Sequence, residues 1–131
     1  MLVLDTHVLV WWLNGAPGLS RKAAAAVRAA AKNKELVVAA ISIFEISTAV
    51  RRGRLQLHVA LDVWLSALAQ LPEVRVEPVT MEVARMAGAL DEAFPGDPAD
   101  RMIAATAWSL DAPLVTADKR LRAVESLATI W

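Results

Sequence analysis

The chain has 131 residues, of which 56% are hydrophobic and 21% charged, with 14 basic side chains, 14 acidic side chains and no cysteine. This length and apolar content predict a single domain spanning residues 1–131 and exclude a disordered protein. The lack of cysteine excludes a disulfide framework and a zinc–thiolate site, and the zero net charge gives no support for nucleic acid as a partner.

The N-terminal segment MLVLDTHVLVWWL is largely apolar, but Asp5 and His7 interrupt it and no basic residues precede it. A secretory signal needs a basic segment followed by an uninterrupted apolar one, so this segment is interpreted as the start of a mature protein. No apolar run approaches the roughly 18 residues of a membrane-spanning helix. We therefore expect a soluble, cytoplasmic protein.

The first half of the chain alternates short apolar runs with longer amphipathic segments. Residues 2–4 and 36–40 are continuous apolar runs, which is typical of buried strands. We expect a helix over residues 6–13 and a second helix that begins after Ser20 and is rich in alanine. A third helix is expected from Ser42 to about Arg52, with Gly53 ending it.

The alternation continues in the second half. A helix over residues 61–71 ends before Pro72, and residues 74–79 alternate apolar and charged side chains, which predicts a strand with one open face. The remaining expected elements are a helix at 79–90, a helix from Asp97 to about Leu110, a strand at 114–116, a short helix at 118–125 and a strand at 128–131. Such alternation of strand and helix, with continuous apolar strands, predicts an α/β protein with a mostly parallel sheet flanked by helices on both faces.

Four acidic residues occur at or near the ends of these strands. Asp5 directly follows the first strand, Glu45 comes one helical turn after the second, and Asp118 comes two residues after Val115-Thr116. Asp100 lies in the first turn of the helix that Asp97 begins. A parallel sheet would bring all four to one edge, where like charges repel unless a cation offsets them. Mg²⁺ or Mn²⁺, which prefer oxygen ligands, would do so.

Each acid also has a structural interpretation, and the residues alone leave it open. Ser42 and Glu45 match a capping box, in which Glu45 would bond back to the start of its helix. Asp97, Asp100 and Asp118 could cap helices or complement their dipoles. Only Asp5 lacks such an interpretation, because a carboxylate that ends a buried strand is costly without a partner.

Other candidates are weaker. Thr6 and Thr116 could hydrogen-bond a carboxylate or a metal-bound water, and His7 is expected to pack or to orient a neighbour rather than to act as acid or base. Basic residues that could contact phosphates are Arg51, Arg52 and Lys119. The side chains of Trp12, Trp64 and Trp108 are expected in the core or in an interface.

Taken in order, the segments LVLDTHVLVWW, AAISIFEISTAVRRGRL, GDPADRMIAATA and APLVTADKRL closely resemble PIN-domain ribonucleases of the VapC toxin group. The resemblance covers essentially the whole chain and assigns its four acids to Asp5, Glu45, Asp100 and Asp118, with Thr6, Asp97 and Thr116 as auxiliary residues. Many relatives carry histidine just before the Asp-Pro motif, where this chain has Phe94-Pro95-Gly96. The resemblance also implies a sheet of five parallel strands, a homodimer and a cognate VapB-type antitoxin.

The expected activity is hydrolysis of RNA phosphodiesters with one or two Mg²⁺ or Mn²⁺ ions, and the resemblance implies products with 5′-phosphate and 3′-hydroxyl ends. Two alternatives remain open: a structure-specific DNA nuclease, and a catalytically silent module that binds RNA or a protein. A phosphatase is less consistent, because Asp5-Thr6-His7 lacks the second aspartate of a D-x-D motif. The residues do not identify the RNA.

Overall fold

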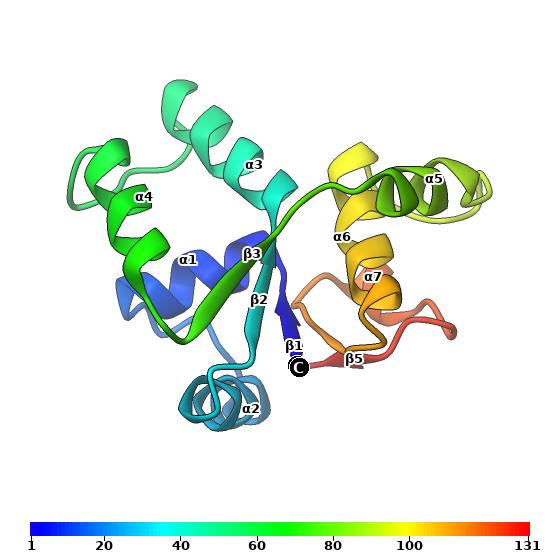
Figure 1. Ribbon diagram of the computed structural model, residues 1–131, viewed down its shortest axis with the longest axis horizontal. Helices are drawn as coiled ribbons and strands as arrows, with labels where there is room; N and C mark the ends of the chain where they lie inside the picture. Colours follow the sequence, from blue (N-terminus) through cyan, green and yellow to red (C-terminus); the bar gives the residue numbers. More distant parts are fainter.

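A computed structural model describes all 131 residues, with five strands and seven helices (Figure 1). The strands are β1 (Leu2–Leu4), β2 (Leu36–Ala39), β3 (Val74–Glu77), β4 (Leu114–Val115) and β5 (Thr129–Ile130). The helices are α1 (Thr6–Asn14), α2 (Arg21–Lys32), α3 (Ala40–Arg51), α4 (Leu61–Gln70), α5 (Met81–Ala89), α6 (Pro98–Ser109) and α7 (Lys119–Arg122).

The strands form one sheet in the order β3-β2-β1-β4-β5, and every neighbouring pair is parallel. The expected α/β class and five-stranded parallel sheet are therefore confirmed. Helices cover both faces of the sheet, with α1 and α2 on one side and α6 and α7 on the other (Figure 1). Because all strands run the same way, their carboxyl ends lie at one edge of the sheet.

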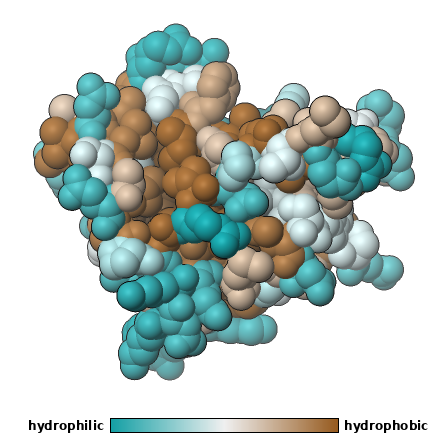
Figure 2. Space-filling view, in the orientation of Figure 1, coloured by the Kyte–Doolittle hydropathy of each residue, from teal (hydrophilic) through white to brown (hydrophobic).

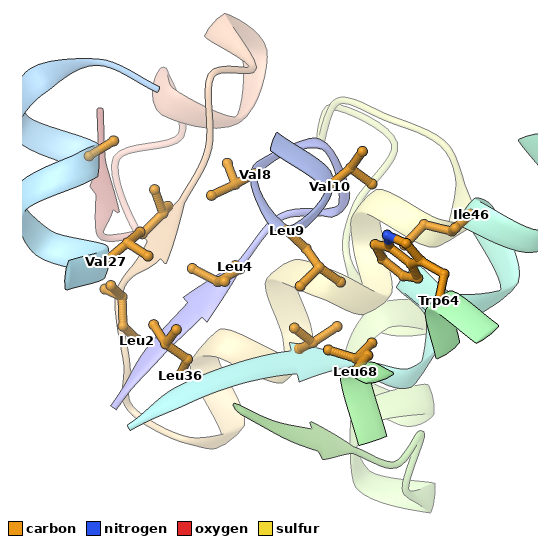
Figure 3. Close-up of a cluster of buried hydrophobic side chains, with 13 residues drawn as sticks. Leu2, Leu4, Val8, Leu9, Val10, Val27, Leu36, Ile46, Trp64 and Leu68 are labelled. Atoms are coloured by element: carbon orange, nitrogen blue, oxygen red, sulfur yellow. The ribbon is translucent and has the colours of Figure 1, made fainter. Parts of the chain in front are cut away.

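Two hydrophobic clusters hold these layers together. Leu2 and Leu4 of β1 face the cluster that includes α1, α2 and Trp64 of α4, part of which is drawn in Figure 3. Val3 points to the opposite face and packs with Ile103 of α6. Successive strand side chains alternate between faces, so a three-residue strand that is apolar throughout is buried on both sides.

Several element boundaries differ from the expected ones. Helix α3 begins at Ala40 and its N-cap is Ala39, which offers no side-chain acceptor, so the prediction that Ser42 begins this helix is wrong. The ladder between β2 and β3 continues to Ala39, and the helix starts directly at the next residue. Strand β3 ends at Glu77, and Thr80 rather than Val79 precedes α5.

The helix starts at Ser20 and Asp97 are as expected. The Ser20 hydroxyl accepts a hydrogen bond from the Ala23 N–H at 3.1 Å, and Asp97 forms a full capping box with Asp100. The longest helices have 12 residues, and none combines the length and apolar character that a membrane crossing needs.

Candidate active site

All four predicted acids line one pocket of about 600 Å³ at the carboxyl-end edge of the sheet. Asp5 and Asp118 are the N-cap residues of α1 and α7, directly after β1 and shortly after β4. Glu45 lies in α3, which follows β2, and Asp100 lies in the first turn of α6. In Figure 1, α3 and α6 extend from this edge on either side of the end of β1. The topology thus brings together residues that are up to 113 positions apart.

Asp5 is the most buried acid, with only 4% of its surface exposed. One carboxylate oxygen accepts from the Thr6 N–H at 2.8 Å, and the other accepts from the Thr116 hydroxyl at 2.7 Å. The Thr116 oxygen also accepts from the Asp118 N–H at 3.0 Å. Thr116, which is fully buried, therefore fixes the positions of two acids at once.

Thr6 holds the third acid. Its hydroxyl donates to Glu45 Oε1 at 2.6 Å, and its oxygen lies 2.8 Å from the buried Ser42 hydroxyl. Burial raises the pKa of Glu45, the hydrogen bond from Thr6 opposes that shift, and the charge of Asp5 adds to it. Glu45 thus points into the pocket and not back to the start of its helix, which rules out the capping-box interpretation.

Asp100 is strongly affected by its neighbours. Burial, together with the negative charges of Asp97, Asp5 and Glu45, raises the pKa of Asp100 to about 6. Its carboxylate faces the Asp97 N–H at 3.4 Å, while its own N–H donates to Asp97 at 3.0 Å. The capping interpretation is therefore correct for the Asp97–Asp100 pair, and the same geometry aims Asp100 at the pocket.

Asp118 behaves differently. Burial alone would raise its pKa, but hydrogen bonds from the Arg120 backbone and guanidinium outweigh this and lower it. The Asp118 carboxylate accepts from the Arg120 N–H at 2.8 Å and lies 3.4 Å from the Arg120 guanidinium nitrogen. The helix-cap interpretation of Asp118 is correct as well, and the residue still lines the pocket.

His7 connects two of the acid-bearing segments. Its Nε2 accepts from the Ala117 N–H at 3.0 Å, and its Nδ1 lies 3.7 Å from Asp5. Because Nε2 accepts, the neutral ring carries its proton on Nδ1, on the side of the carboxylate. His7 also packs against Trp11, with the ring centroids 5.0 Å apart. No feature of the sequence indicated its hydrogen bond to Ala117, which lies 110 positions away.

The basic residues that were predicted to contact phosphates lie in different places. Arg52 lines a second groove beside the pocket, Lys119 lines a separate recess with Lys22 and Arg122, and Arg51 is exposed outside both. The tryptophans lie as expected: Trp64 is buried in the core, Trp12 packs against it, and Trp108 packs against the opposite cluster. Sequence reasoning missed Ser42 as a neighbour of Thr6 and Arg120 as a partner of Asp118. The position of Arg120, two residues after an aspartate that begins a helix, is the sequence signal that could have indicated the latter.

The parallel sheet and the acidic pocket at its carboxyl-end edge place the chain among α/β proteins whose site follows the ends of the strands. The family profile described as "PIN domain" matches residues 2–127. The chain is also 45% identical over 121 residues to Ribonuclease VapC22 of Mycobacterium tuberculosis, covering 92% of this chain and 89% of that protein. The chain belongs to the PIN-domain family, and within it to the VapC group.

Solved structures share the fold at low identity. VapBC2 from Rickettsia felis, bound to a promoter DNA fragment, superposes with a TM-score of 0.73 at 17% identity, covering 98% of this chain and 96% of that one. FitAcB from Neisseria gonorrhoeae superposes with a TM-score of 0.69 at 24% identity, covering 98% and 96%. At such identities the likeness extends to the fold alone.

Proposed function

We propose that this protein is a divalent-metal-dependent endoribonuclease that acts as the toxin of a toxin–antitoxin pair. The name of the relative from Mycobacterium tuberculosis supports ribonuclease activity, and one solved structure with this fold, from Klebsiella pneumoniae, is a toxin–antitoxin complex. The observation that carries the proposal is the pocket itself, which Asp5, Glu45, Asp100 and Asp118 line from four separate elements.

The donor set fits Mg²⁺ or Mn²⁺. Carboxylate oxygens are the ligands these ions prefer. Burial raises the pKa of Glu45 and of Asp100, and the neighbouring carboxylates, whose charge a cation would offset, add to both shifts. No three side chains converge on one point in the present arrangement. Asp100 and Asp118 accept hydrogen bonds from backbone N–H groups at the starts of their own helices, and each carboxylate keeps further lone pairs that could bind an ion.

The four acids would hold one or two ions, which when bound supply a more acidic water and neutralise charge on the phosphate. Hydrogen bonds from neighbouring residues hold the acids in fixed orientations. Thr116 and the Thr6 N–H hold both oxygens of Asp5, so this carboxylate has one orientation. Thr6 directs Glu45, and Asp97 positions the backbone of Asp100. No side-chain nucleophile is needed.

We also propose two protein partners. Beside the acids, the pocket has an apolar wall that includes Val10, Trp11, Ile46 and Leu55. A segment of a VapB-type antitoxin with apolar side chains and one Arg or Lys would match both the wall and the acids, and would block metal binding. A second copy of the chain would cover some of the exposed apolar surface, which gathers over and between α3, α4 and β3 (Figure 2).

The test is cleavage of RNA by the purified, antitoxin-free protein. We expect cleavage with Mg²⁺ or Mn²⁺ and none with EDTA. Asp5→Asn should slow cleavage at least about a hundredfold, the scale found when a key electrostatic group is lost. The matched control is Asp62→Asn, which changes an exposed acid at the start of α4 and should leave the rate unchanged. Cleavage that persists in EDTA and in Asp5→Asn would overturn the proposal, and a wild type that binds RNA without cutting it would favour a silent binding module.

A further inference from the structure

A second groove, of about 430 Å³, adjoins the acidic pocket. It lies between α3 and the first turn of α6, with Asp97 and Pro98 on the α6 side. Glu45 lines both hollows, so a chain that crosses the acids can continue into this groove without leaving the surface. The groove is therefore continuous with the acidic pocket.

An aromatic ring stands open in this groove. Phe44 is 66% exposed, and it belongs to none of the hydrophobic clusters that hold the fold together. Phe44, Thr48 and Arg52 follow one another at four-residue spacing, so they lie along one face of α3 over a length of about 12 Å. A large apolar side chain that is left in water next to polar groups suits a ligand with a flat, aromatic surface.

Two cations lie at the far end of the same groove. Helix α3 ends at Arg51, and Arg52 is its C-cap residue. Gly53, with φ of 71°, then turns the chain so that Arg54 also lines the groove. Neither guanidinium takes part in an ion pair with an acid of this chain. The groove therefore has an acidic end at Glu45, next to the proposed metal site. Phe44 provides an aromatic surface, and Arg52 and Arg54 form a basic end.

We infer that this groove binds the unpaired nucleotides of single-stranded RNA next to the bond that is cut. One base stacks on Phe44, and the backbone phosphates contact Arg52 and Arg54. Stacking requires a base whose faces are free, so a duplex would lose this contact. This inference rests on the proposed ribonuclease function and adds to it a binding site, in which Phe44 stacks a base and Arg52 and Arg54 contact phosphates.

The test measures RNA binding and cleavage separately. Binding is followed by fluorescence anisotropy in EDTA, where no cleavage is expected, with a labelled RNA of about ten nucleotides, single-stranded or annealed to its complement. The variants are Phe44→Ala, Phe44→Trp and the pair Arg52→Ala with Arg54→Ala. The matched controls are Val63→Ala, another exposed apolar residue, on α4, and Arg28→Ala, an exposed arginine on α2.

Loss of stacking and loss of charge should affect RNA binding in different ways. Phe44→Ala should weaken single-strand binding at least about fivefold without changing the dependence of log Kd on log salt, and Phe44→Trp should retain binding. The double arginine variant should reduce the slope of that dependence by about 1.4, because each phosphate contact to a single strand contributes about 0.7. The control variants and the duplex affinity of Phe44→Ala should be unchanged.

Three results would overturn the inference. If wild type cleaves RNA with Mn²⁺ but Phe44→Ala binds single strands as tightly as wild type, the groove is not the substrate path and the proposed function stands. If Phe44→Ala changes the oligomeric state with unchanged affinity, the groove is a protein interface. If wild type neither binds nor cleaves RNA, the proposed function fails, and the inference fails with it.

Discussion

The buried side chain of Thr116 contacts two of the four acid-bearing segments of the pocket. Its hydroxyl donates to Asp5 and its oxygen accepts from the Asp118 N–H, so one buried atom joins the segments after β1 and β4. A threonine at the end of a strand is ordinary in sequence, and its importance here comes from two contacts with distant parts of the chain.

Replacing Thr116 tests that arrangement. Thr116→Val keeps the volume but leaves one oxygen of Asp5 and one N–H without partners, so we expect a loss of about 1–3 kcal/mol in the free energy of unfolding. RNA cleavage should fall as well, because Asp5 loses its fixed orientation. Thr116→Ser keeps the hydroxyl and should stay close to wild type. Urea unfolding and cleavage rates measure both effects, and equal behaviour of the Val and Ser variants would contradict the assignment.

The raised pKa of Asp100 predicts that the stability of the metal-free protein depends on pH. Its pKa is raised from the ordinary value of 3.8 to about 6, so the folded state holds this proton more tightly than the unfolded state does. Its contribution to stability is therefore present below about pH 4 and is lost as the pH rises through 6. Asp100→Asn cannot ionise, and we expect it to melt about 2–6 °C above wild type near pH 7.5, and together with wild type near pH 4.

The control for this melting series is Asp62→Asn. Asp62 lies exposed in the first turn of α4, where a negative charge favours the helix dipole. Its replacement should lower the melting temperature slightly near neutral pH, which is the opposite sign. If Asp100→Asn also lowers it there, the charge cluster does not destabilise the fold and Asp100 acts only as a helix cap.

At the scale of elements, the start of α6 decides where Asp100 points. Asp97 and Asp100 form the capping box, Pro98 occupies the first turn, and Gly96 adopts φ of 98° just before it. A Cβ at Gly96 would lie 2.5 Å from an Asp100 carboxylate oxygen. Only glycine accommodates both the positive φ and this close approach.

Gly96→Ala should therefore harm both the fold and the site. We expect a loss of at least about 1 kcal/mol in the free energy of unfolding, with slower RNA cleavage because Asp100 is displaced. Gly88→Ala is the matched control, since Gly88 lies inside α5 with open space around its Cα and should gain about 0.5–1 kcal/mol. Urea unfolding of the two variants measures both effects. An unchanged free energy of unfolding in Gly96→Ala would show that the turn is not constrained.

For the whole molecule, metal binding and folding should be coupled. An ion that binds only the folded state adds about 2.7 kcal/mol at a hundred times its Kd, so Mn²⁺ should raise the melting temperature of wild type by several degrees. The increase should be smaller in Asp5→Asn and Asp100→Asn. A wild-type melting temperature that does not respond to Mn²⁺ or Mg²⁺ would remove the metal from the proposed mechanism.

The exposed apolar side chains predict a homodimer. Met81 is 90% exposed, and Val76 and Val79 just before it are also exposed. Covering such surface favours association. Light scattering at micromolar concentration should give twice the chain mass of 14.1 kDa. A monomer at every concentration tested would contradict this prediction.

The sequence by itself determined the sheet, its helices and the acids at its edge. Short runs without a polar residue are typical of strands buried between two helix layers, which indicates a parallel sheet and places Asp5, Glu45, Asp100 and Asp118 near the same end of it. Local capping rules also placed Asp97 correctly, because a helix start depends on the few residues around it.

Only the tertiary structure decided which of these acids is held by which partner. Ser42 and Glu45 match a capping box, yet α3 starts two residues earlier, because β2 pairs with β3 through Ala39 and the chain turns directly into helix. That shift turns Ser42 and Glu45 toward Thr6 of a different helix. The links from Thr116 to Asp5 and from His7 to Ala117 likewise join residues more than 100 positions apart. Such contacts depend on strand order and register, which no local pattern encodes.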